Sequence, residues 1–260
     1  MVGTALLAGS LAPLNSTMIV VALPEILADL GASISWGSWI IVSYLVAMAA
    51  VQPLGGSLGD RYGRRLMVTI GLLVFLLASV AAAVAPNVEV LIGARTSQAI
   101  AGAIALPNGS ALVRTLVPRE LHGRMFGLIG VGIGAAAAFG PPLGGLVADA
   151  YGWRWIFAAN FAVILPALVL VLNLPRSARQ LDAGRFDLLG AGLLLTALVS
   201  LAMAATVWRV PGVPALAAYA CGATGIVTGT WFWRHVLRRV AAPIPSTSRC
   251  SPAPVTCRRG

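Results

Sequence analysis

The chain has 260 residues, of which 58% are hydrophobic and only 10% are charged. A soluble domain of this length needs more charge than this to cover its surface. The apolar residues fall in runs of roughly 20, the length that one helix needs to cross a bilayer. The composition therefore predicts an all-α polytopic membrane protein whose main surroundings are the lipid bilayer.

The apolar runs and the turn residues between them predict eight spans. In chain order these are residues 3–24, 36–58, 66–85, 89–113, 123–148, 153–174, 186–207 and 213–235. Gly31, Pro86–Asn87 and Tyr151–Gly152 supply turn chemistry at three of the joints. All seven tryptophans lie at predicted span ends, where the headgroup layer favours their amphipathic rings. Met1 precedes apolar sequence without a basic stretch, so no removable signal peptide is expected.

Arginine placement predicts how the spans are oriented. All 18 basic residues are arginine, and the formal net charge is +10. The loops after the second, fourth, sixth and eighth spans carry Arg61, Arg64, Arg65; Arg114, Arg119, Arg124; Arg176, Arg179, Arg185; and Arg234, Arg238, Arg239. Because basic loops stay in the cytoplasm, we expect a multi-pass protein of the plasma (inner) membrane with both termini cytoplasmic. This pattern explains the positive charge, so no nucleic-acid partner is expected.

The stretch GGSLGDRYGRR, residues 55–65, concentrates rare charges between the second and third spans. Gly56 and Gly63 are expected to permit close helix approach and an unusual backbone angle. An ordinary positive-inside loop explains the arginines but not the order of the residues. The order Gly56, Asp60, Arg61, Gly63, Arg64, Arg65 resembles the signature loop of the major facilitator superfamily. The resemblance implies that the acid and the first arginine help to latch the cytoplasmic ends of two halves.

The fourth predicted span contains ARTSQAIAGAIALPNGSALV. Arg95 lies well inside it, and a charged residue within a span is functional by default because its burial is costly. The alternative is a side chain that snorkels to the outer interface. Arg95, Gln98 and Gly102 resemble the span-4 motif of the same family, and the resemblance implies a role for the arginine in proton coupling.

The fifth predicted span is rich in small residues. Gly130, Gly132 and Ala135 mimic a dinucleotide-binding fingerprint, but no strand precedes them, so we reject that reading. Pairs of glycines four residues apart instead predict a smooth face for a neighbouring helix. These pairs are Gly123 and Gly127, Gly130 and Gly134, and Gly140 and Gly144. Gly140, Pro141, Gly144 and Gly145 resemble the family's antiporter motif, which implies export rather than uptake.

The first predicted span carries polar residues near its middle, in LNSTMIVVALPEI. This segment resembles the first motif of the fourteen-span drug:proton antiporters, in which the position of Asn15 is commonly an aspartate. Because a neutral amide cannot carry a proton, the departure argues against direct proton coupling through this span. We expect Asn15 and Thr17 to line a central cavity with Gln52 and Asn108; Asn15 serves equally well as a hydrogen-bonding link between helices.

The resemblance to a six-span half covers residues 1–175. Residues 176–240 resemble the two extra spans that lie between the halves of the fourteen-span subfamily. Residues 241–260 are rich in Pro, Ser, Arg and Cys and do not resemble the family. A disordered cytoplasmic tail and a frameshift after Pro243 or Ile244 both account for this change. A second half, or the mate in a homodimer, is then needed to complete a carrier.

The sequence therefore predicts a piece of a proton-coupled multidrug exporter that moves a small molecule against proton counter-flow. Two alternatives stay open: an exporter of a sugar, peptide or secondary metabolite, and a membrane fragment that does not transport. No enzyme is expected, because the chain lacks a nucleophile elbow, a P-loop and a metal-ligand cluster, and because His122 and His235 lie in basic loops. No cofactor or metal is expected either.

Overall fold

The computed structural model describes residues 2–174, 188–207 and 215–240, and these residues form helices without strands. The helices are α1 (Val2–Asp29), α2 (Ile34–Tyr62), α3 (Arg64–Ala83), α4 (Val88–Leu116), α5 (His122–Tyr151), α6 (Arg154–Leu172), α7 (Leu188–Val207) and α8 (Ala215–Val240). A short 3₁₀ turn, Arg119–Leu121, precedes α5. The all-α architecture predicted from composition is confirmed.

Each of the eight predicted ranges coincides with a helix. The helices α1 to α6 are long and apolar enough to cross a membrane. In α7 the apolar stretch is shorter, Gly192–Ala205, and α8 ends in a basic turn. The largest boundary differences are at the ends of α1, which continues through Pro24 to Asp29, and of α8, which continues to Val240. A prediction from hydropathy ends a span at its first polar residues. The helix itself continues as long as its backbone hydrogen bonds do, which extends it into the headgroup layer.

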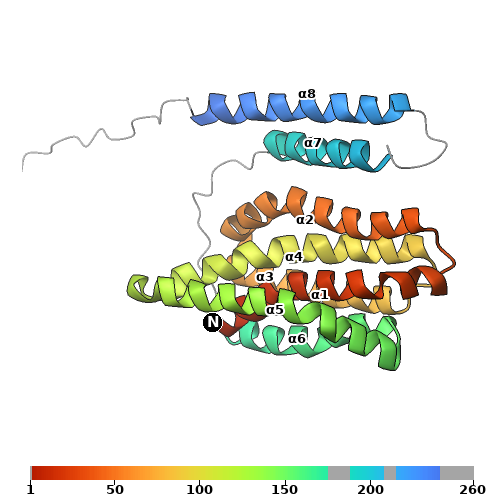
Figure 1. Ribbon diagram of the computed structural model, residues 1–260. Coiled ribbons are helices and arrows are strands. Elements are labelled where there is room, and N and C mark those ends of the chain that lie inside the picture. Colours follow the sequence, from red (N-terminus) through yellow and green to blue (C-terminus); the bar gives the residue numbers. More distant parts are fainter. Residues whose placement is uncertain (1, 175–187, 208–214, 241–260) are drawn as a thin grey trace, which may run out of the picture.

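The helices α1 to α6 form one bundle, and α7 and α8 lie together on the α2 side of it (Figure 1). Within the bundle, α1 packs mainly against α5 and also touches α4 and α6, while α3 packs against α4 and α6. The helix α2 lies between α4 and α7, and α8 contacts α7. The arrangement makes α1 and α4 the central helices.

Two apolar clusters hold the bundle together. One includes Ile19, Ile26 and Phe157 and joins the end of α1 to the start of α6. The other includes Leu72 and Ile164 and joins α3 to the second half of α6. Burying one such side chain stabilises a fold by about 1.5–3 kcal/mol in water. Within a bilayer the lipid is as apolar as the core, so close packing supplies more of the stability.

The outer surfaces of the bundle are also apolar. On α3, for example, Leu73 and Leu77 are 44% and 69% exposed, and on α6 Val169 is 59% exposed. Large apolar surfaces of this kind are rare on soluble monomers. Such a surface suits the hydrocarbon core of a bilayer. The backbone hydrogen bonds are made within each helix, so only apolar side chains face the lipid.

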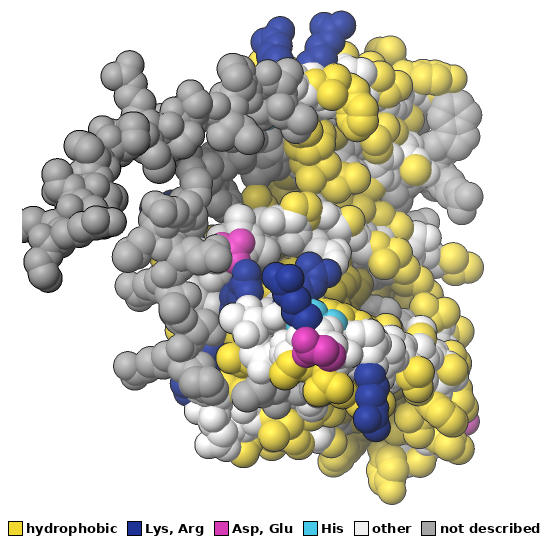
Figure 2. Space-filling model, turned by 90° about the vertical axis from the view of Figure 1, so that its left-hand side faces the viewer, with side chains coloured by type: hydrophobic (Ala, Val, Ile, Leu, Met, Phe, Trp, Pro, Cys, Tyr) yellow, Lys and Arg dark blue, Asp and Glu magenta, His cyan; other side chains and the backbone are white. Residues whose placement is uncertain are grey.

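Basic side chains gather at one end of the bundle, which Figure 2 shows face on. This end brings together the end of α2, the start of α3, the end of α4 and the start of α5. Its arginines include Arg61, Arg114 and Arg124, all of them exposed. The arginines of the loops after the second and fourth predicted spans thus lie at one end of the bundle, whereas those after the sixth span, Arg176, Arg179 and Arg185, lie outside the described residues.

Three glycines at predicted turns adopt positive φ. These are Gly31 at 59°, Gly63 at 102° and Gly152 at 89°. Side chains with a Cβ rarely adopt such angles, so glycine is required where α2 reverses into α3 and α5 into α6. The unusual backbone angle predicted at Gly63 is confirmed.

One tryptophan differs from the predicted headgroup belt. Trp153 is only 2% exposed, whereas Trp155, Trp231 and Trp233 are more than half exposed. Its Nε1 donates to Asp29 at 3.1 Å, and its backbone N–H donates to Glu25 at 3.2 Å. Glu25, although exposed, therefore helps to seat the tryptophan. These acids at the end of α1 give the indole a partner inside the protein, so it does not need the lipid interface. Trp208 lies outside the described residues.

Candidate functional site

The helices α2 and α4 approach most closely at two glycines. A Cβ on Gly55 would collide with the carbonyl of Ala103, and one on Gly59 would collide with the side chain of Asn108. A Cβ on Gly56 would meet nothing within 4 Å. The close approach that we assigned to Gly56 is therefore made by Gly55 and Gly59, because Gly56 is turned about 100° around the helix from Gly55. The spacing of Gly55, Gly59 and Gly63 by four residues was the available signal.

The side chain of Asn108 closes this contact. Its Nδ2 donates to the carbonyl of Gly55 at 2.7 Å and to that of Ile104 at 2.7 Å. Asn108 is only 1% exposed. We predicted it in a central cavity, but it serves as a polar link between two helices, since the absence of side chains at Gly55 and Gly59 leaves room for it.

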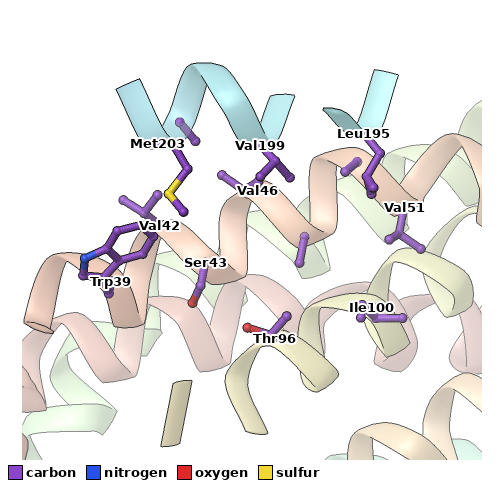
Figure 3. A pocket seen from close by; sticks show the side chains of 13 residues that line it. Trp39, Val42, Ser43, Val46, Val51, Thr96, Ile100, Leu195, Val199 and Met203 are labelled. Atoms are coloured by element: carbon purple, nitrogen blue, oxygen red, sulfur yellow. The ribbon is translucent and has the colours of Figure 1, made fainter. Parts of the chain in front are cut away.

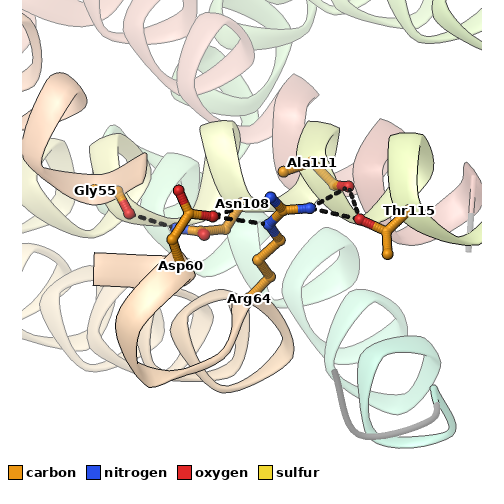
Figure 4. A network of polar contacts seen from close by, with 6 residues as sticks. All are labelled: Gly55, Asp60, Arg64, Asn108, Ala111 and Thr115. Atoms are coloured by element: carbon orange, nitrogen blue, oxygen red, sulfur yellow. Dashed lines mark hydrogen bonds and ion pairs between the residues drawn. The ribbon is translucent and has the colours of Figure 1, made fainter. Parts of the chain in front are cut away.

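The acid of the signature loop is paired with its second arginine (Figure 4). Arg64 Nη2 lies 2.9 Å from Asp60 Oδ1, and Arg64 Nε donates to the same oxygen at 3.2 Å. Arg64 Nη1 reaches across to α4, where it donates to the carbonyl of Ala111 at 3.2 Å and to Thr115 Oγ1 at 2.5 Å. One guanidinium thus joins the ends of α2, α3 and α4.

The other two arginines of the loop have separate positions. Arg65 Nη2 donates to the carbonyl of Leu172, the last residue of α6, at 2.5 Å. Arg61 is exposed, and its guanidinium carbon lies 5.6 Å from the ring of its neighbour Tyr62. Among the described residues, the internal contacts of the loop are therefore made by Arg64 and Arg65. Arg61, the arginine expected to latch two halves, is free to reach a surface beyond the bundle.

Arg95 is buried in the half of the bundle that lies away from the basic end. Its side chain is only 2% exposed, so it does not snorkel to the interface. Nη1 donates to Asn15 Oδ1 at 2.7 Å and to Gln98 Oε1 at 3.0 Å. The guanidinium carbon lies 4.1 Å from the ring centroid of Tyr44, a cation–π contact. In the described residues no carboxylate pairs with this cation, so amides and one aromatic face carry its stabilisation.

Hydrogen bonds extend the group around Arg95 into α3 and α6. Gln98 Nε2 donates to Ser79 Oγ at 2.9 Å, and Asn160 Nδ2 donates to the same oxygen at 3.2 Å. Ser79 and Asn160 are at most 2% exposed. Sequence reasoning missed these two residues and Tyr44, although isolated polar residues in apolar spans were a usable signal. Gly102 has no side chain to join the network. A Cβ there would lie an ordinary 3.9 Å from Ala12 and Phe75, so the position does not require glycine for close packing either.

The antiporter-like segment of α5 lies directly against α1. A Cβ on Gly144 would lie 2.7 Å from Met18 Cα, and one on Gly140 would collide with Thr17 Oγ1. Pro141 is exposed, and a Cβ on Gly145 would be an ordinary 3.7 Å from Val21. Two of the four motif residues thus set the distance between α1 and α5.

The remaining glycines predicted to form a smooth face do not meet a neighbour. Gly123, Gly127, Gly130 and Gly134 have nothing within 4 Å of the position of a Cβ. The spacing of four residues defines a face of the helix but not which part of that face another helix covers. In the described residues the covered side of α5 instead includes Ile129, which packs with Ala5 and Val113, and Gly132, where a Cβ would lie 2.9 Å from Leu6.

The four cavity candidates do not converge. Asn15 joins Arg95, whereas Asn108 links α2 to α4. Thr17 donates to the carbonyl of Pro13 on its own helix at 2.8 Å. Gln52 is exposed on α2. A polar residue in an apolar span is a candidate for a functional or structural role. The rotation of the helix about its axis decides whether that residue faces a cavity, a neighbouring helix or the outside.

We expect Gly144→Ala to weaken the contact between α1 and α5, because its Cβ would press on the backbone of Met18. Overpacking of this kind costs about 2 kcal/mol. The measurement is thermal unfolding of the purified protein in detergent. Gly145→Ala is the matched control, since its Cβ finds ordinary contact distance. Equal melting temperatures for the two variants would contradict the prediction.

Arg64→Ala and Arg61→Ala are expected to separate two roles of the loop. Arg64→Ala removes a partly buried ion pair and two further hydrogen bonds, so we expect it to lower stability by about 1–3 kcal/mol. Arg61→Ala removes only an exposed contact, and we expect a change within about 0.5 kcal/mol. Both are measured by thermal unfolding in detergent. A larger loss for Arg61→Ala would show that the assignment is reversed.

Comparison with known proteins agrees with this arrangement. Residues 5–242 match the family described as the Major Facilitator Superfamily. The match covers most of the chain, including the signature loop, the span of Arg95 and the outer half of α5. The chain belongs to the major facilitator superfamily, a family of membrane transporters, and is a multi-pass membrane protein.

Named relatives include two bacterial transporters. The chain is 35% identical over 231 residues to a probable actinorhodin transporter of Streptomyces coelicolor, an alignment that covers 87% of this chain and 40% of that protein. It is 33% identical over 232 residues to the multidrug efflux pump LfrA of Mycolicibacterium smegmatis, covering 89% of this chain and 46% of the pump. The chain therefore spans less than half the length of these relatives.

Among solved structures, the chain resembles the crystal structure of the POT family transporter PepTSo. The TM-score is 0.66 at 14% sequence identity, over 93% of this chain and 55% of that one. At this identity the likeness concerns the fold alone.

Proposed function

We propose that the chain is the N-terminal part of a multidrug exporter driven by proton counter-flow. The observation that carries the proposal is the likeness to a multidrug efflux pump along 89% of this chain. The close packing of Gly140 and Gly144 against α1 supports it, because the same residues carry the resemblance to an antiporter motif. Substrates would be small apolar or cationic compounds.

Residues 1–175 are proposed to be one half of the carrier, and residues 176–240 two linker spans of a fourteen-span protein. The chain's coverage of under half of its named relatives supports this division. The missing half is proposed to be a C-terminal partner segment, or the second copy in a homodimer. The basic end of the bundle supports a cytoplasmic position for both termini in the plasma membrane. The proposed tail, residues 241–260, lies outside the described residues.

Arg95 is proposed to couple transport to protons without an acid of its own. Arg95 Nε and Asn15 Nδ2 are buried donors that have no acceptor in the described residues. Two unused donors beside a buried cation favour an acceptor with negative charge. We propose that a carboxylate of the second half supplies it, and that protonation of this carboxylate releases Arg95 during the cycle. Asn15 then orients the arginine and carries no proton.

A specific observation favours a second candidate function. The likeness to a probable actinorhodin transporter covers 87% of the chain, so export of a secondary metabolite is the alternative within transport. Apolar cavities bind many compounds, and the described residues that we predicted to line one do not converge. Drug panels that include polycyclic aromatic metabolites distinguish the two candidates.

The function is tested by dye efflux. Cells that lack their own efflux pumps express the gene with its flanking DNA intact, are loaded with ethidium, and are energised. We expect faster efflux than from vector-only cells, and loss of the difference when a protonophore collapses the proton gradient. Efflux at the vector rate, for ethidium and for a panel of other cationic and neutral compounds, would refute the exporter proposal.

A further inference from the structure

A cavity of about 300 Å³ lies between α2, α4 and α7, away from the group around Arg95 (Figure 3). Its walls include Trp39 and Val46 from α2, Ile100 from α4, and Val199 and Met203 from α7. The volume is at the lower end of the range for small-molecule sites, roughly 300–1,000 Å³. None of the polar residues predicted to line a central cavity belongs to it.

The lining of the cavity is apolar and uncharged. No acidic or basic side chain is among its lining residues, so nothing there would balance a charged ligand. Leu195, Val199 and Met203, which form the α7 wall, are themselves 37–39% exposed on the outer surface. The cavity therefore communicates with the surface that faces hydrocarbon, and its ligand would enter from the bilayer.

Two hydroxyl groups form the polar end of the cavity. In Figure 3 the side chains of Ser43 and Thr96 point toward each other between α2 and α4. Thr96 Oγ1 donates to the carbonyl of Ile92 at 2.8 Å, which leaves its lone pairs available. Ser43 Oγ is buried and has no hydrogen-bond partner in the described residues. A buried hydroxyl without a partner is unfavourable, and a ligand that bonds it recovers that loss.

We propose that this cavity binds an uncharged amphiphile, with its hydroxyl or carbonyl group at Ser43 and its hydrocarbon chain along α7. Ser43 can donate to a carbonyl or accept from a hydroxyl, and Thr96 can accept. The chain would fill the space between Val46 and Val199 and fasten α7 to the bundle. The site is independent of the proposed exporter function, because it shares no residue with the group around Arg95.

The test uses the full chain in lipid nanodiscs and a photoactivatable diazirine analogue of octanol. After irradiation, adducts are mapped by mass spectrometry, and we expect them to concentrate in residues 39–51 and 195–203. Val46→Trp fills the cavity, so labelling of these segments should fall at least fivefold. Leu45→Trp is the matched control: Leu45 is 55% exposed and does not line the cavity, so labelling should persist.

A smaller substitution keeps the test independent of folding defects. Unlabelled octanol competes with the photolabel for the cavity. Ser43→Ala should raise the octanol concentration that halves the labelling about fivefold, as expected for one lost hydrogen bond. Ser57→Ala, an exposed serine that donates to Leu54 on α2, should leave the competition unchanged. Equal competition in the two serine variants would remove Ser43 from the site and overturn the proposed orientation.

The source of the amphiphile is resolved by native mass spectrometry of the detergent-extracted protein. Retention of one uncharged lipid, such as a diacylglycerol, by the wild type and by Leu45→Trp, but not by Val46→Trp, would identify a membrane lipid as the occupant. Competition by free octanol without retained lipid would identify a dissolved amphiphile. Either result supports the site. Adducts spread over all lipid-facing helices, or undiminished in Val46→Trp, would overturn it.

Discussion

Arg95→Ala is expected to reduce dye efflux at least tenfold, to the rate of cells without the exporter. Arg95 is a buried cation in a membrane span, where a charge is maintained only if its surroundings compensate it. Removing it leaves Asn15 Oδ1 and Gln98 Oε1 without the donor that joins them. Hydrogen bonds to charged groups contribute about 1.5–3 kcal/mol each. The measurement is the initial rate of ethidium efflux from energised cells.

Two further variants show whether the shape or the charge of Arg95 matters. Arg95→Lys keeps the charge but loses the planar fork that bonds two amides while it lies against Tyr44, so we expect only partial efflux. Arg114→Ala removes an exposed arginine of the same helix and should leave efflux near the wild-type rate. Full efflux by Arg95→Ala, with normal protein in the membrane, would exclude Arg95 from the transport cycle.

Gly55→Ala is expected to separate α2 from α4, whereas Gly56→Ala is expected to change little. A Cβ on Gly55 would collide with the carbonyl of Ala103 and lie 2.9 Å from Ile104 Cα. Because both neighbours belong to the backbone, no side-chain rotation can relieve the contact. We therefore expect a loss of about 3 kcal/mol, the upper end of the usual cost of overpacking. Thermal unfolding in detergent measures it.

The adjacent residue makes the comparison sharp. Gly56 belongs to the family-like motif, but its Cβ position is open. Alanine is a better helix former than glycine by about 1 kcal/mol, so Gly56→Ala should be neutral or slightly stabilising in this chain. If Gly56→Ala destabilised the protein as much as Gly55→Ala, the rotation of α2 described by the structure would be incorrect.

Much of the fold could be predicted because the bilayer imposes strong local rules. Runs of apolar residues defined eight helices, and a glycine followed by two arginines marked the reversal at Gly63 with its φ of 102°. The end of α1 was placed too early, at Pro24, although the helix continues to Asp29. A proline within a span is tolerated when neighbouring groups satisfy the freed backbone carbonyl.

The candidate site was predictable only in part. Arg95 was identified from its position, but its partner Asn15 lies 80 residues away in sequence and its aromatic contact Tyr44 on another helix. Asp60 was associated with Arg61, whereas it pairs with Arg64 one helical turn away across Gly63. Which residues meet depends on the rotation of each helix about its axis, and a rotation of one position separates Gly55 from Gly56.

The sequence by itself determined the class of protein, the number of helices and the end at which the positive charge gathers, because hydropathy and charge act residue by residue against the bilayer. The tertiary structure alone decided the partners of Arg95, the arginine that holds Asp60, and the apolar cavity beside α7. These features arise where helices distant in sequence pack together, and packing depends on the shape of a whole helix face.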